Sequence, residues 1–221
     1  MDSGRAESFS DGVFAVAITV LVFNLLPIAQ DTASSLHVAT LLSHWPAFVA
    51  YVISFLTIGI MWLNHHTMLA QVSKVNRIVL VLNLFLLMGV VAIPFPTALV
   101  ADHLTGSHSD HGQATVAAVT YGLVMMAISI GYAALWMYLA AHQAELGARR
   151  KVRTPRLTTL RFTAGNAGYL IGTLVALVNS IAALTIFGLL AVYYLFEHLP
   201  EQPGSEPGDG TTWPDDATEL S

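Results

Sequence analysis

The feature that most constrains this chain is a series of long apolar stretches, most of which contain no charged side chain at all. Only 10% of the 221 residues are charged, whereas a soluble domain carries about a quarter. A helix of about 18 or more apolar residues matches the hydrocarbon core of a bilayer. The chain is therefore predicted to be an all-α membrane protein.

The apolar stretches predict six transmembrane helices. They cover residues 9–27, 45–69, 78–100 and 114–141, and the stretch 162–196, which is too long for one span and is divided at Asn179-Ser180 into two helices. Pro94-Phe95-Pro96 should kink or end the third helix, because proline lacks a backbone N–H and crowds the preceding turn. We expect a single transmembrane domain over residues 1–199 and a disordered acidic tail over residues 200–221.

The basic residues predict the orientation of these helices. All nine lie in alternate segments, namely Arg5, then Lys74 and Arg77, then Arg149, Arg150, Lys151, Arg153, Arg156 and Arg161 between the fourth and fifth helices. The opposite loops contain no Lys or Arg. Because basic loops stay inside, we expect a multi-pass protein of the cell membrane with both termini in the cytoplasm, in contact with membrane lipid.

Composition also excludes several classes of function. The net charge of −5 argues against nucleic acid as a partner, since a phosphate backbone requires clustered basic residues. The chain contains no cysteine, so disulfides and thiolate metal sites are ruled out. It also lacks Gly-x-Ser-x-Gly, His-Glu-x-x-His and paired membrane carboxylates. We therefore expect no enzyme activity, no metal site and no cofactor.

The first helix has two different faces. Residues at i, i+3, i+4 and i+7 spacings form one stripe, which contains Phe9, Gly12, Val16, Thr19, Val20 and Phe23. Asp11 points roughly the other way, so it should turn into the helix bundle and find a partner. Ser10 and Asp11 could equally cap the start of the helix. The stripe itself fits either ordinary packing or the lining of a pore.

Three sequence blocks in the same order and spacing resemble the transmembrane protein 175 family. The blocks are Arg5-x-x-x-Phe9-Ser10-Asp11 with its continuation to Thr19, Trp62-Leu-Asn-His65-His66, and Asn83-Leu-Phe-Leu-Leu through Pro94-Phe95-Pro-Thr97. Members of that family are potassium-permeable channels of endolysosomes and their six-helix prokaryotic relatives. The resemblance covers roughly the first hundred residues.

The resemblance implies a symmetric homotetramer in which the first helix of each subunit lines a central pore for monovalent cations such as K⁺. It places a narrow ring of apolar side chains at Val16, Val20 and Phe23, with the Thr19 hydroxyl between them. Such a ring gates by dewetting. Family members often carry an acidic residue just beyond the ring, where this chain has Asn24, which would weaken the attraction of cations at the outer mouth.

Trp62, His65 and His66 lie at i, i+3 and i+4, so they share one side of the second helix, level with Arg5, Phe9, Ser10 and Asp11 of the first. A polar network among these residues would hold the first helix at a fixed rotation, as the resemblance also implies. Adjacent histidines on a helix diverge by about 100° and make a poor metal site. A pH-sensing role for the histidines stays open.

We interpret the chain as a subunit of a potassium-permeable cation channel. The alternative is a proton-coupled secondary transporter that uses Asp11 and the two histidines as a relay, although the paired broken helices typical of transporters are not evident. In an outer loop, His108, Asp110 and His111 either bind a divalent ion or are ordinary solvated residues.

Overall fold

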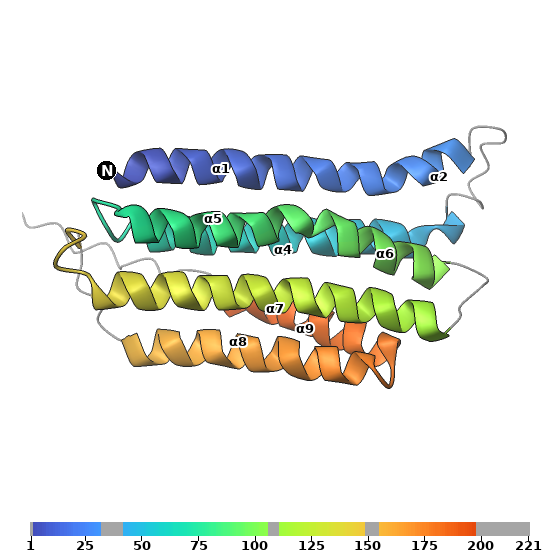
Figure 1. The fold of residues 1–221 in the computed structure, drawn as a ribbon. Coiled ribbons are helices and arrows are strands. Elements are labelled where there is room, and N and C mark those ends of the chain that lie inside the picture. The colour runs from blue at the N-terminus through green and yellow to red at the C-terminus, as the bar shows by residue number, and fades with distance from the viewer. Residues whose placement is uncertain (1, 32–41, 106–110, 149–154, 198–221) are drawn as a thin grey trace, which may run out of the picture.

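The computed structural model describes residues 2–31, 42–105, 111–148 and 155–197. Within them all the regular structure is helical and forms one bundle of roughly parallel and antiparallel rods (Figure 1). The helices are α1 (Ser3–Val20), the 3-10 segment η1 (Leu21–Leu25), α2 (Leu26–Asp31), α4 (Trp45–Leu69), α5 (Arg77–Ala92), α6 (Pro94–Thr105), α7 (His111–Ala141), α8 (Pro155–Ala176) and α9 (Ser180–Glu197). The predicted all-helical fold is confirmed.

The helices join into six rods, because α1, η1 and α2 follow one another, as do α5 and α6. Four segments of the described chain are long and apolar enough to cross a membrane, namely Ser3–Gln30, Ala47–Leu69, Arg77–Asp102 and Gly112–Ala141. A shorter apolar helix covers Ser180–Tyr194, and α8 contains 22 residues. The chain is thus a multi-pass membrane protein, and these four segments overlap the first four predicted spans.

Two predicted interruptions are present. The third span breaks at Ile93, between α5 and α6, where the Ile93 N–H donates to Val90 O at 3.1 Å. The break follows from Pro94, which has no N–H to continue the α-helical ladder. The last stretch divides between Ala176 and Ser180, where the Asn179 side chain accepts a hydrogen bond from Ala182 N at 3.0 Å and so caps α9.

Two predicted boundaries are wrong. The first helix begins at Ser3 rather than near residue 9, because Asp2 provides the N-cap and its side chain accepts a hydrogen bond from Gly4 N. The fifth helix begins at Pro155 rather than at residue 162, so Arg156 and Arg161 belong to α8 and not to a loop. Proline at the first helical position is favourable, since its missing N–H has no intrahelical partner there.

The core runs along the middle of the bundle. Helix α7 packs against α5, α6 and α8, while α1 lies at one edge and packs against α4 and α5 (Figure 1). Buried residues recur every three or four positions, as in α5, where Val79, Asn83, Leu86, Leu87 and Val90 face inward. The tail predicted for residues 200–221, together with His108 and Asp110, lies outside the described residues, and so does the side chain of His111.

Candidate pore-lining site

The stripe predicted on the first helix lies largely on the outer surface of the subunit. Val16 is 58% exposed and Phe23 is 60% exposed, and Phe9, Gly12 and Thr19 are exposed as well. Val20 is the exception, because its side chain is partly buried. The Thr19 hydroxyl donates to Val16 O at 2.9 Å, which leaves the lone pairs of the Thr19 oxygen on this outer face.

The opposite face of α1 holds the helix to its own subunit. Its buried residues follow a helical period and are Ser3, Ala6, Ser10, Phe14 and Ala17, continued by Leu21 in η1. Phe14 packs its ring against His65 of α4, with 5.3 Å between the ring centroids. Because this face is filled by α4 and α5, the outer stripe faces away from the subunit and is available to other copies of the chain or to lipid.

A buried chain of hydrogen bonds joins three helices at this face. Asn83 of α5 donates from Nδ2 to Ser10 Oγ at 2.9 Å, and its Oδ1 lies 2.7 Å from His65 Nε2. Ser10 in turn donates to Ala6 O at 2.8 Å. All three side chains are almost fully buried, so each would lose free energy if it were left without a partner.

This chain of bonds fixes the protonation of His65. Because the Asn83 amide nitrogen donates to Ser10, the Asn83 amide oxygen must accept from His65. This places the imidazole proton of His65 on Nε2. His65 Nδ1 is buried and has no hydrogen-bond partner among the described residues. A second proton there would be an unpaired buried charge, so the structure favours a neutral His65 and gives it no geometry for a proton relay.

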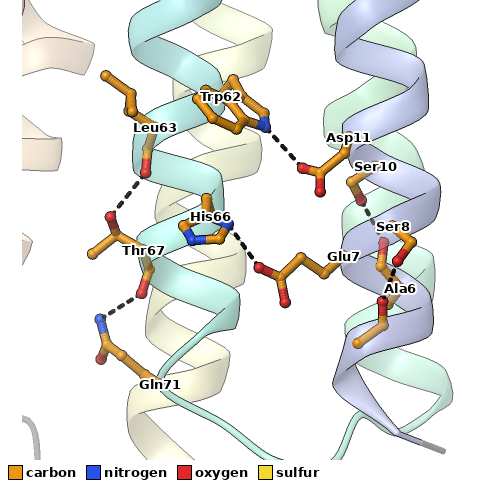
Figure 2. A network of polar contacts seen from close by, with 11 residues as sticks. Ala6, Glu7, Ser8, Ser10, Asp11, Trp62, Leu63, His66, Thr67 and Gln71 are labelled. Carbon is orange, nitrogen blue, oxygen red and sulfur yellow. Dashed lines mark hydrogen bonds and ion pairs between the residues drawn. The ribbon is translucent and has the colours of Figure 1, made fainter.

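Two further contacts tie α1 to α4 along the same side, as Figure 2 shows. Trp62 Nε1 donates to Asp11 Oδ1 at 2.8 Å, and His66 Nδ1 lies 2.7 Å from Glu7 Oε1. The side chain of His66 is 51% exposed and that of Glu7 is 22% exposed. The carboxylate of Asp11 thus has the partner that its place in a membrane span requires.

The capping interpretation of Ser10 and Asp11 is wrong, because both residues lie beyond the second turn of α1, whose N-cap is Asp2. The structure brings Ser10, Asp11, Trp62, His65 and His66 together.

Arg5 and Phe9 take no part in these contacts and are exposed. Sequence reasoning missed the bridging role of Asn83 and the contact of Glu7 with His66. The available signal for Asn83 was an amide side chain within an otherwise apolar span.

Comparison with known proteins identifies relatives of this chain. The family described as endosomal/lysosomal potassium channel TMEM175 matches residues 5–94. A potassium channel of Streptomyces collinus is 42% identical over 200 residues, which are 90% of this chain and 94% of that protein. The endosomal/lysosomal proton channel TMEM175 of Homo sapiens is 30% identical over 64% of this chain, but the match covers only 29% of that longer protein.

A solved structure extends the similarity to the whole bundle. The crystal structure of a lysosomal potassium-selective channel TMEM175 homolog from Chamaesiphon minutus superposes with a TM-score of 0.73 and 32% sequence identity. The match covers 88% of this chain and 97% of that one. On the strength of these similarities, the chain belongs to the TMEM175 family, a family of potassium channels and not of enzymes.

Proposed function

We propose that the chain is one subunit of a homotetrameric potassium channel of the cell membrane, with the outer face of α1 lining a central pore. Two kinds of support exist. Relatives that match nearly the whole chain are named potassium channels, and α1 presents an apolar stripe on the outer surface of its subunit.

The observation that carries the proposal is the exposure of Val16 and Phe23 on a helix whose other face is locked to α4 and α5. Four such helices around an axis would enclose successive rings of Val16, Thr19, Val20 and Phe23. Apolar rings exclude water when the pore is narrow and admit it when the pore widens slightly, so they can act as a gate. The Thr19 hydroxyls would provide oxygen atoms to a passing K⁺ ion.

The polar contacts of Ser10, Asp11, Trp62, His65 and His66 serve as a positioning network in this proposal. They fix the rotation of α1 and therefore decide which of its side chains face the axis. A transporter is less well supported, because the neutral His65, whose Nε2 is bonded to Asn83 and whose Nδ1 has no hydrogen-bond partner among the described residues, and the Trp62-bound Asp11 offer no relay for protons.

Single-channel recording of the purified protein in planar bilayers tests the proposal. The protein should carry unitary K⁺ currents, and Val16→Ala should raise the conductance or the leak because a smaller side chain widens the ring. Val178→Ala is the matched control, since Val178 is 91% exposed in the turn after α8 and far along the chain from the stripe. Recordings in which protons replace K⁺ as the permeant cation show whether this chain conducts protons, the ion in the name of its human relative.

The absence of current at every voltage and pH, in a preparation whose oligomer is intact, would refute the channel. Saturable substrate flux that follows a proton gradient would favour the transporter instead. Equal effects of Val16→Ala and Val178→Ala would leave the channel in place and refute the assignment of α1 as its lining.

A further inference from the structure

The first rod of the bundle, which consists of α1, η1 and α2, has a local feature that the sequence does not reveal. At Leu21 the α-helical geometry of α1 gives way to five residues of 3-10 helix, η1, before α2 begins. A 3-10 helix is narrower than an α-helix, its hydrogen bonds have poorer geometry, and a stretch of it within a longer helix is a common place for a hinge. Phe23, one of the residues of the exposed stripe, lies in the middle of this segment.

A side-chain hydrogen bond joins η1 to another rod of the bundle. Asn24 Nδ2 donates to the backbone carbonyl of Pro94 at 3.0 Å, although the two residues are 70 positions apart. The carbonyl can only accept, so the amide nitrogen of Asn24 must be the atom that faces it. Asn24 is partly buried, whereas its neighbours Val22 and Phe23 are 45% and 60% exposed.

The partner of Asn24 is itself firmly placed. Pro94 begins α6 at the break after α5, and α6 is held to α4 three residues later by the contact of Thr97 Oγ1 with Ser54 Oγ at 3.0 Å. Thr97 also donates to Ile93 O at 2.9 Å, which stabilises the backbone across the break. The anchor point therefore belongs to a helix that a buried hydrogen bond joins to α4, while the anchored segment is the 3-10 segment η1.

We infer that Asn24 is a positioning residue, whose hydrogen bond to Pro94 fixes the rotation of η1 and so holds the Phe23 side chain on the outer face of α1. Consecutive residues of a 3-10 helix differ by about 120° in direction. When Asn24 is directed at Pro94, Phe23 must therefore point away from α6. The consequence for conduction rests on the proposed function, but the positioning itself does not.

This role differs from the one that the sequence suggests for Asn24. A residue at the outer mouth would act on cations through its charge or dipole, and an acid there would attract them. In the structure the amide is directed into the subunit, toward a carbonyl, so its hydrogen-bond donor matters rather than its charge. Replacement by the isosteric acid should consequently remove the anchor, because an ionised carboxylate cannot donate to Pro94 O.

Spin labelling tests the positioning without any need for ion flow. The chain contains no cysteine, so Phe23→Cys and Val16→Cys each provide one site for a nitroxide label in the full-length protein in liposomes. Asn24→Leu should raise the mobile fraction at position 23 by about fivefold, the effect of one lost hydrogen bond. Position 16 precedes η1 by several residues and should keep its line shape.

Two companion variants sharpen the result. Asn24→Asp should behave like Asn24→Leu, whereas Asn24→Gln, which keeps an amide donor, should restore much of the original line shape at position 23. An unchanged spectrum at position 23 in the Leu and Asp variants would overturn the inference. Equal changes at positions 16 and 23 would also overturn it, because they would indicate a general loss of stability.

Recordings of the unlabelled channel separate this inference from the proposed function. Asn24→Leu and Asn24→Asp should both alter the conductance or the open fraction in the same direction. A larger conductance in Asn24→Asp alone would place the side chain at the mouth and overturn the inference. If the unchanged chain carries no current, the proposed function fails, while the line shape at position 23 still decides whether Asn24 positions Phe23.

Discussion

At the scale of single residues, the junction of α1, α4 and α5 depends on one amide. Asn83 donates to Ser10 and accepts from His65, so it satisfies one polar atom on each of two other helices within a buried site. Membrane spans seldom contain such groups unless they have a role. The cost of losing the amide is therefore greater than that of a solitary hydrogen bond, because two partners would be left without it.

Replacement of Asn83 by leucine tests this dependence. Leucine has a similar volume but leaves the Ser10 oxygen and the His65 N–H unpaired, so we expect the protein to lose about 1–3 kcal/mol of stability. Thermal unfolding of the purified protein in detergent measures the effect as a lower midpoint. Thr67→Val is the control, since Thr67 is exposed and its hydroxyl donates to Leu63 O of its own helix. Similar midpoints for both variants would contradict the prediction.

The sequence predicted part of this junction and missed the rest for physical reasons. Helical spacing alone placed Trp62, His65 and His66 on one side of a helix that meets the start of α1. Spacing within one helix cannot show which residue of a third helix completes the network, so the bridging role of Asn83 required coordinates. The hydrogen bond from Asn24 to Pro94 escaped notice for the same reason, because it spans 70 positions.

At the scale of helices, close packing in the second half of the chain depends on glycines that allow neighbours to approach. A Cβ atom on Gly172 of α8 would collide with the ring of Phe187 on α9, and one on Gly122 of α7 would collide with Thr173 and Phe187. The sequence revealed the number of these helices and the break at Asn179, but it could not show which glycines lie at the contacts.

We predict that Gly172→Ala destabilises the packing of α8 on α9 by about 1–3 kcal/mol, the usual cost of overfilling a packed interior. Gly188→Ala on α9 is a matched control, because apart from the nearby backbone of its own helix no atom of the described chain lies within 4 Å of the Cβ that it would add. In Gly188→Ala we expect a midpoint equal to that of the parent or slightly higher, since alanine favours helix. Thermal unfolding in detergent compares the two, and a larger loss in Gly188→Ala would refute the packing argument.

At the scale of the whole molecule, the exposed stripe of α1 predicts that several copies of the chain assemble. The single chain has a mass of 23.7 kDa, and a pore lined by α1 requires several copies around one axis. We expect light scattering on the protein in mild detergent, corrected for bound detergent, to give four times the chain mass. A monomer that nevertheless conducts ions would contradict the assignment of α1 as the lining of a shared pore.

The orientation of the bundle in the membrane is also a property of the whole molecule. The structure gathers Arg5, Lys74 and Arg77 at the end where α1 begins, and the isolated bridge between Asp2 and Lys74 joins the segments there. The turn after α7 lies at this end too, since Ser73 and Lys74 donate to Leu146 O. Because basic residues at one end of a bundle are retained inside, this end should face the cytoplasm.

Single cysteines provide the measurement, since the chain has none of its own. Ala144→Cys lies in the turn after α7 at the basic end, and Ser43→Cys lies just before α4 at the opposite end; both positions are exposed. An impermeant thiol reagent added to intact cells should label position 43 at once but position 144 only after permeabilisation. The reverse pattern would mean that the bundle has the opposite orientation, with the start of α1 outside the cell. Labelling of both positions in intact cells would mean that the basic residues do not fix a single orientation.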